Sequence, residues 1–176
     1  MRSPSQTIGP FFAMALPWSE GPFVVKEGTT GAVHLRGKLL DGAGQPVPDG
    51  LIEIWQADGE GRMAETADGF RGFGRCPTDG EGRYAFHTVK PGSVRGADGA
   101  IHAPCVLVSV FARGLLKRAV TRIYFPDEED ANRVDPVLSQ MDDARDRATL
   151  LATQTTGGYV FDICLQGEHE TVWFEP

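Results

Sequence analysis

The chain has few cysteines, and their number and spacing argue against a fold stabilised by disulfides or by structural zinc. Three cysteines occur among 176 residues, Cys76, Cys105 and Cys164. Because they are odd in number, widely spaced and without a Cys-x-x-Cys pair, neither a disulfide framework nor a structural zinc site is expected. We expect all three to be reduced and partly buried, as small apolar residues are.

Long apolar runs and basic clusters are also missing. No apolar run approaches the roughly 20 residues of a membrane-spanning helix. The first five residues lead into no apolar stretch typical of a secretory signal, so the cytoplasm is the expected compartment. Lys and Arg number 17 against 24 Asp and Glu, a net charge of −7. Such a chain repels phosphate backbones, so neither nucleic acid nor a membrane is an expected partner.

Turn residues are abundant, and they separate short apolar runs. The chain has 22 glycines and 12 prolines. Between them lie strand-like runs at residues 32–40, 51–57, 83–89, 104–111 and 118–125. The nearly continuous apolar run 104–111 is typical of a central strand covered on both faces. Residues 159–165 and 171–174 flank a tight polar segment and predict a closing hairpin, whereas the glycine-rich residues 62–75 indicate a loop.

Helical patterns occur only late in the chain. Residues 127–132 are acidic, which suits a helix N-terminus, and residues 142–153 place alanines and a leucine on one face. We therefore predict a single domain over residues 1–176. Its fold class is all-β, a β-sandwich with one or two short helices inserted late in the chain.

Residues with the spacing of a catalytic or metal site are scarce. The four histidines form no i, i+2 or i, i+4 pair, and no Gly-x-Ser-x-Gly motif occurs. Cys105 lies in an apolar run, which raises rather than lowers a thiol pKa. On residue chemistry alone we expect neither a catalytic residue nor a metal ligand in this chain.

Two features remain open to a functional interpretation. The arm Ser5–Pro10 is followed by Phe11 and Phe12, which are costly to leave exposed. It either packs on its own domain or reaches a partner. Arg113 follows the apolar run 104–111. It is either solvated or ion-paired within this chain, or it binds a carboxylate through two parallel hydrogen bonds.

Several motifs resemble those of the intradiol ring-cleaving dioxygenases over almost the whole chain. Family-wide elements are Glu53-Ile-Trp-Gln-Ala-Asp58 and Lys90-Pro-Gly92. The arm Ser5-Gln-Thr-Ile-Gly-Pro10 and the segment Phe111-Ala-Arg-Gly114 resemble the alpha chain of the two-chain members. Together these motifs identify the chain as a member of that family.

The family's iron ligands have no counterpart in this sequence. Fe(III) is held in this family by two tyrosines and two histidines, and the histidine positions correspond here to Cys105 and Leu107. One tyrosine normally follows the Lys-Pro-Gly element, where this chain has Ser93-Val94-Arg95. The other belongs to the loop after Trp-Gln-Ala, and residues 58–75 contain no tyrosine. The resemblance thus implies that this chain binds no iron at the family position.

The resemblance also implies a partner and a reaction. Fe(III) is expected in a beta chain, which forms alpha–beta pairs with this chain in a larger oligomer, and this chain alone is expected to be inactive. Residues 1–16 would be an arm reaching the partner chain, with Thr7, Gly9, Pro10 and Arg113 contributing to its substrate pocket. The implied reaction cleaves 3,4-dihydroxybenzoate between its hydroxyls with O2 to give 3-carboxy-cis,cis-muconate, in the beta-ketoadipate pathway of aromatic catabolism.

A second hypothesis is a stand-alone β-sandwich that binds carbohydrate or another small ligand. Exposed aromatic side chains in a groove would support it, and Trp18, Trp55 and Trp173 are the candidates. We expect Trp55 and Trp173 to pack in the core.

Overall fold

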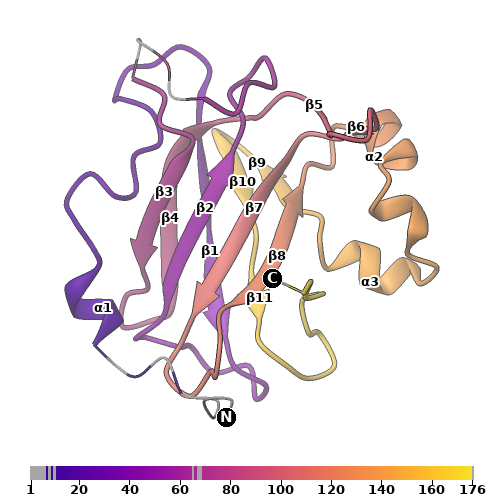
Figure 1. Ribbon diagram of the computed structural model, residues 1–176. Coiled ribbons are helices and arrows are strands. Elements are labelled where there is room, and N and C mark those ends of the chain that lie inside the picture. Colours follow the sequence, from indigo (N-terminus) through magenta and orange to yellow (C-terminus); the bar gives the residue numbers. More distant parts are fainter. Residues whose placement is uncertain (1–6, 8, 10, 65, 67–68, 176) are drawn as a thin grey trace, which may run out of the picture.

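Alternating apolar residues build two β-sheets that pack against each other in a computed structural model of the chain (Figure 1). The structure describes residues 7, 9, 11–64, 66 and 69–175. One sheet has the order β3-β2-β7-β8, and all its neighbours are antiparallel. Its strands are β2 (Leu51–Gln56), β3 (Phe73–Pro77), β7 (Cys105–Phe111) and β8 (Ala119–Tyr124).

The other sheet is arranged around a long first strand, which pairs antiparallel on one side and parallel on the other. Its strands are β1 (Ala32–Leu40), β4 (Arg83–Val89), β9 (Thr153–Thr155), β10 (Gly158–Val160) and β11 (Ile163–Cys164). β4 is the antiparallel neighbour of β1, β10 and β11 are its parallel neighbours, and β9 pairs with β10.

The remaining elements are short. A two-stranded ribbon is formed by β5 (Val94–Arg95) and β6 (Ile101–His102). The helices are α1 (Phe12–Ala15), α2 (Glu129–Val134), the 3₁₀ turn η1 (Leu138–Gln140) and α3 (Ala144–Ala148). The last three lie together beside β8, at the right of Figure 1. Among the described residues, no helix is both long and apolar enough to cross a bilayer.

The core lies between the two sheets. The inward residues of β1, β2, β4 and β7 are almost fully buried: Leu35, Leu39, Ile52, Ile54, Phe86, Val106, Val108 and Val110. Burying each such side chain contributes about 1.5–3 kcal/mol. A smaller cluster of Ala103, Tyr124, Leu138 and Leu150 attaches the helical insert to the end of β8.

Close approach of the backbone requires glycine at position 37 of β1. A Cβ placed there would lie 1.7 Å from the carbonyl oxygen of Phe161. The same carbonyl accepts a hydrogen bond from the Tyr84 hydroxyl at 2.6 Å. The missing side chain thus lets the residues after β10 lie directly against β1.

The predicted sandwich with late helices is confirmed, as are the strands at 32–40 and 83–89 and the central place of β7. The strand predicted at 51–57 is present and ends one residue earlier, at Gln56. A further short helix, α1, precedes the sheets. The predicted helix at 142–153 is shorter than expected, since α3 covers only Ala144–Ala148. The chain then returns to β8, where the N–H of Ala152 donates to the carbonyl of Tyr124 at 2.9 Å.

Three other predictions are wrong. The expected loop at 62–75 is wrong for its last three residues, which begin strand β3; the alternation of β3 is hidden because Gly74 packs in the core without a side chain. The expected closing hairpin is absent from the described residues: β10 and β11 pair in parallel with β1, while Phe174 bridges to Val120. Coverage of β7 on both faces is wrong as well, because its outer residues are only half-buried.

Candidate functional site

The described part of the N-terminal arm lies against the connection between β7 and β8. The Thr7 hydroxyl donates to the carbonyl of Leu115 at 3.4 Å, and the Gly9 N–H donates to Thr7 Oγ1 at 3.3 Å. Gly9 has a φ of +78°, a left-handed conformation that glycine adopts without strain. Pro10, the third predicted arm residue, lies outside the described residues.

The two phenylalanines that follow the arm have different environments. Phe12 is buried and its ring lies 6.4 Å from that of Phe111, whereas 70% of Phe11 is exposed. The segment directly after the arm therefore packs on its own domain through Phe12 and leaves the Phe11 ring in solvent.

Arg113 lies at the same end of the molecule, just after β7. Its Nε pairs with Asp49 Oδ2 at 3.0 Å, and 68% of its side chain is exposed. Such an exposed pair contributes roughly 0–1 kcal/mol, so the guanidinium can exchange Asp49 for another carboxylate at little cost. The structure thus brings Thr7, Gly9 and the 113–115 connection together at one edge of the sandwich.

A cavity of about 160 Å³ lies at the opposite end of β7, on the outer face of the sheet. Its lining residues come from β2, β5, β6, β7, β8 and the loop after β2: Trp55, Gln56, Ala57, Met63, Val94, His102, Cys105, Leu107 and Arg122. Cys105 and Leu107, which the resemblance implies to stand at the family's histidine positions, both line this cavity. Val94, two residues after the Lys-Pro-Gly element, lines it as well.

The cavity does not offer the donors that ferric iron requires. One imidazole, His102, and one thiol, Cys105, are its metal-binding side chains. Burial raises the pKa of Cys105 to about 11, so the thiol is protonated at neutral pH. Among the described residues, no three or more His, Cys, Asp or Glu are grouped to hold a metal ion. The chemistry of this donor set therefore does not fit Fe(III).

A buried carboxylate supports the wall of the cavity. Asp135 accepts hydrogen bonds from the N–H groups of Ala103, Val137 and Leu138 at 2.9–3.0 Å and from the Tyr124 hydroxyl at 3.1 Å. Burial raises the pKa of Tyr124, and the neighbouring Asp135 contributes in the same direction. The buried Tyr84 hydroxyl likewise has a partner, since it donates to the carbonyl of Phe161.

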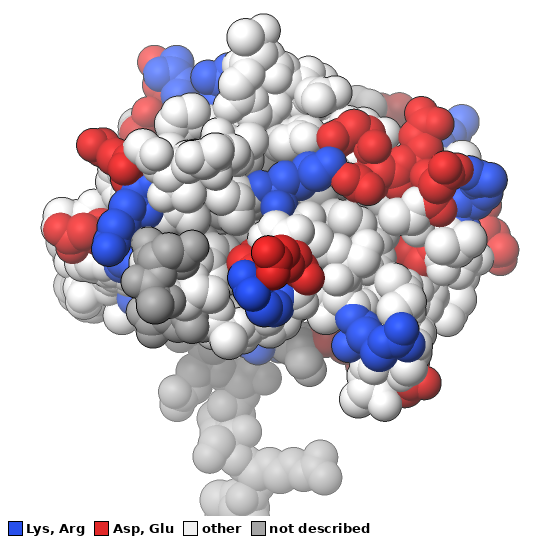
Figure 2. All heavy atoms as spheres, turned by 90° about the horizontal axis from the view of Figure 1, so that it is seen from above, with Lys and Arg blue, Asp and Glu red and all other residues white. Residues whose placement is uncertain are grey.

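The Lys-Pro-Gly element is fixed by a charged cluster. Lys90 Nζ pairs with Asp127 at 2.8 Å and with Glu128, and the Tyr159 hydroxyl donates to Asp127 at 3.1 Å. Burial lowers the pKa of Lys90, but the hydrogen bonds to Asp127 and Glu128 outweigh it and raise the pKa overall. The face seen in Figure 2 carries Lys and Arg interspersed with Asp and Glu.

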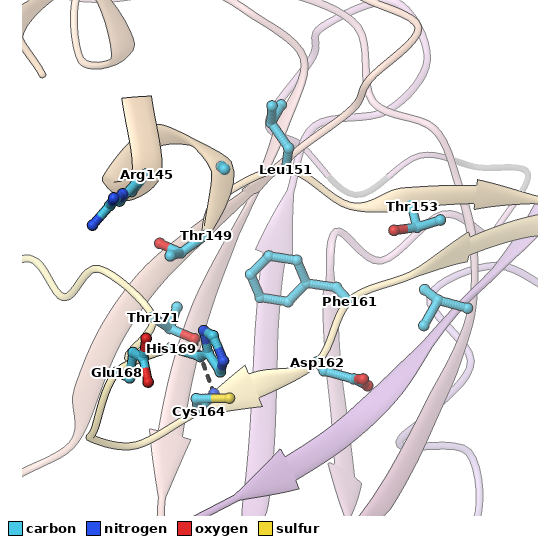
Figure 3. A pocket seen from close by; sticks show the side chains of 12 residues that line it. Arg145, Thr149, Leu151, Thr153, Phe161, Asp162, Cys164, Glu168, His169 and Thr171 are labelled. Carbon is cyan, nitrogen blue, oxygen red and sulfur yellow. Dashed lines mark hydrogen bonds between the residues drawn. The ribbon is translucent and has the colours of Figure 1, made fainter. Parts of the chain in front are cut away.

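A separate hollow of about 630 Å³ lies between α3 and β11 (Figure 3). Arg145 of α3 and Glu168 and His169 of the loop after β11 line it. At its floor the Cys164 N–H donates to Thr171 Oγ1 at 3.0 Å. Of the predicted site residues that the structure describes, Thr7, Gly9 and Arg113, none lines this hollow.

Two features of the cavity were missed from the sequence. Trp55 is 44% exposed, so the prediction that it packs in the core is wrong. It alternates outward because Ile54 and Gln56 take the buried face of β2. Arg122 was not singled out, although it alternates with apolar residues in the run 118–125 and so had a detectable signal.

Comparison with known proteins defines the class of this sandwich. A family model described as Dioxygenase matches residues 8–167. The chain belongs to this dioxygenase family, as its motifs predicted.

Individual relatives make the similarity more specific. The chain is 39% identical to the protocatechuate 3,4-dioxygenase alpha chain of Burkholderia cepacia, over 99% of this chain and 97% of that relative. It is 37% identical to the beta chain of the same enzyme and organism, over 79% of this chain and 66% of that relative. Among solved structures, the dioxygenase domain of a dioxygenase–carbohydrate-binding protein fusion from Streptomyces sp. SirexAA-E matches 93% of this chain and 97% of its own, at 27% identity and a TM-score of 0.63.

Proposed function

We propose that the chain is the alpha subunit of a protocatechuate 3,4-dioxygenase and that it holds no iron itself. The observation that carries this proposal is the match to an alpha chain over nearly the full length of both proteins. The assembled enzyme would cleave 3,4-dihydroxybenzoate between its two hydroxyl-bearing carbons, and both atoms of O2 would enter 3-carboxy-cis,cis-muconate.

The iron of the assembled enzyme is assigned to a partner beta chain. The cavity of this chain presents one imidazole and one protonated thiol, which do not fit Fe(III). Because this chain is also similar to a beta chain, the two subunits would be related sandwiches that can form a pseudo-symmetric pair. We place the assembly in the cytoplasm, with residues 1–176 of this chain as one domain.

This chain would contribute to the reaction by lining the substrate pocket of the beta chain and by orienting the substrate. We assign residues 1–16 to an arm that reaches the beta chain, with Thr7, Gly9 and Pro10 walling its pocket and excluding water. Arg113 would bind the substrate carboxylate through its guanidinium, and its exposure and weak pairing with Asp49 support this role.

Kinetics of the co-expressed pair test this assignment. Replacing Arg113→Ala should raise KM for 3,4-dihydroxybenzoate by about tenfold, as expected for a lost charge-assisted hydrogen bond, with a smaller change in kcat. Arg118→Ala, an exposed arginine before β8, is the matched control and should leave both constants unchanged. Equal KM values for the two variants would remove Arg113 from the pocket, and a chain that does not associate with a beta chain would refute the subunit assignment.

The alternative of a stand-alone binding module rests on exposed aromatic rings. Trp18 and Trp55 are both partly exposed and lie against Phe73, with ring centroids 6.2 and 6.0 Å away. The half-buried Trp173, by contrast, packs against the core. The full-length similarity to an alpha chain does not favour this alternative.

A further inference from the structure

A groove of about 630 Å³ lies on the outer face of the sheet that contains β1 and β4. Its lining comes from these two strands, from the end of β3 and the turn that follows, and from residues around the end of β10. No described residue lines both this groove and the cavity that contains Cys105 and Leu107. The groove is therefore a separate feature, on the other sheet of the sandwich.

Short apolar side chains form the floor of the groove. Arg36 of β1 has Ala85 of β4 as its register partner on one side and Val160 of β10 on the other. Because both neighbours are short, the carbon chain of a ligand can lie against them and against the stem of Arg36, which removes apolar surface from water.

Three cationic side chains gather at this groove, although the chain as a whole has a net charge of −7. Arg36 and Lys38 are exposed and two positions apart on β1, so both point to the outer face, about 6.8 Å apart along the strand. Lys38 and Arg83 are direct partners in the antiparallel register, where like charges destabilise a sheet. A bound anion would relieve this repulsion.

Two of the three cations have no ionic partner. Among the described residues, neither Arg36 nor Lys38 forms an ion pair or a side-chain hydrogen bond. Arg83, by contrast, pairs with Glu81. Arg36 and Lys38 are therefore the groups that remain available to an anionic ligand.

The two carboxylates in the groove are engaged by the backbone. Asp162 Oδ1 accepts a hydrogen bond from the N–H of Lys38 at 2.9 Å. Asp79 Oδ1 accepts hydrogen bonds from the N–H groups of Glu81 and Arg83 at 2.9 Å. Three cations thus face two carboxylates, and the lining keeps a net positive charge.

We propose that this groove binds a six-carbon aliphatic dicarboxylate, with one carboxylate on Arg36, the other on Lys38 and the carbon chain against Ala85 and Val160. The spacing of Arg36 and Lys38 along β1 is comparable to the separation of the two carboxylates in such a chain when it is extended. Arg36 holds one end through two parallel hydrogen bonds, and Lys38 holds the other as a point charge. The site binds its ligand without transforming it, and the inference does not depend on the proposed subunit function.

Titration of the full chain with adipate, by isothermal calorimetry at low ionic strength, tests the proposal. We expect saturable binding at a single site. Hexanoate keeps the six-carbon chain but lacks one carboxylate, so it should bind more weakly by about tenfold or more. Arg36→Met and Lys38→Met should each weaken adipate binding to a similar degree. Arg118→Met removes an exposed arginine outside the groove and should bind adipate as the unmodified chain does.

A second titration distinguishes two sources of this ligand chemistry. The product of the proposed reaction, 3-carboxy-cis,cis-muconate, is also a six-carbon chain with a carboxylate at each end, and its choice as the ligand rests on the proposed function. Tighter binding of this product than of adipate would assign the groove to the product. Equal or weaker binding would assign it to a saturated dicarboxylate.

Three results would overturn the proposal. These are no saturable adipate binding, equal affinity for adipate and hexanoate, or equal adipate affinity in Arg36→Met and Arg118→Met when circular dichroism shows both to be folded. If the lone chain does not stay folded, the same titrations are made with the co-purified complex, where loss of one adipate site in Arg36→Met supports the proposal and unchanged binding contradicts it. A complex that cleaves 3,4-dihydroxybenzoate normally but binds no adipate in this groove would overturn this inference alone and leave the proposed function intact.

Discussion

Asp135 is the residue whose removal should most disturb the region around the cavity. Its side chain is completely buried and accepts four hydrogen bonds, which join the start of β7 to α2 and η1. Replacing Asp135→Ala would leave the donors on Ala103, Tyr124 and Leu138 without an acceptor in buried surroundings.

The expected loss of stability follows from these three donors. A buried donor left unpaired costs about 1–3 kcal/mol, and relief from burying a charge offsets part of the sum. We therefore expect Asp135→Ala to lower the free energy of unfolding by about 3–5 kcal/mol. Asp135→Asn keeps one acceptor oxygen and should lose only about 1–2 kcal/mol.

Urea unfolding of the three proteins, followed by circular dichroism, measures these differences. Asp130→Ala is the control, because the Asp130 side chain is 95% exposed and pairs with the exposed Arg133 three residues later. It should change stability by less than about 0.5 kcal/mol. A loss below about 1 kcal/mol for Asp135→Ala would refute the argument that this carboxylate fastens the helical insert to the sheet.

Three further predictions concern other parts of the chain. Gly37→Ala should prevent stable folding, since the new Cβ would lie 1.7 Å from the Phe161 carbonyl oxygen; a thermal melt unchanged from the parent would contradict this. The pKa of Cys105 is raised by burial to about 11, above roughly 8.5 in the unfolded chain, so this thiol stabilises the fold below about pH 8.5 and the effect is lost as the pH rises toward 11. Urea unfolding between pH 8.5 and 11 should show that the free energy of unfolding falls less for Cys105→Ala than for the parent. Equal falls in the two proteins would contradict the view that burial raises the pKa of this thiol. Arg113→Ala should raise KM in the assembled enzyme while Arg118→Ala does not, as steady-state kinetics can show.

Local patterns were sufficient to predict most of the strands. β1 and β4 alternate between buried and exposed residues over seven or more positions and are bounded by turn residues, so their bounds were predictable. β3 was not predicted as a strand, because Gly74 occupies a core position without contributing an apolar side chain to the pattern. The parallel pairing of β10 and β11 with β1 is non-local and leaves no mark in the neighbouring sequence.

The candidate site was predictable only where motifs are contiguous. Thr7, Gly9 and Arg113 lie in two short motifs, and the structure brings both to one edge of the sandwich. The cavity is different, because Trp55 and Arg122 come to line it only through the register of three strands, in which Leu107 lies between them. The same holds for His34 and His87, which are cross-strand partners with ring centroids 5.3 Å apart, although no local spacing joins them.

Iron stoichiometry is the most direct measurement of whether this chain completes a partner's site instead of forming its own. Metal analysis by mass spectrometry should be performed on the chain expressed alone and on the chain co-purified with its beta partner. We predict that the lone chain contains no bound iron and does not cleave 3,4-dihydroxybenzoate, and that the pair contains a single iron and is active. Stoichiometric iron with ring cleavage in the lone chain would contradict the account.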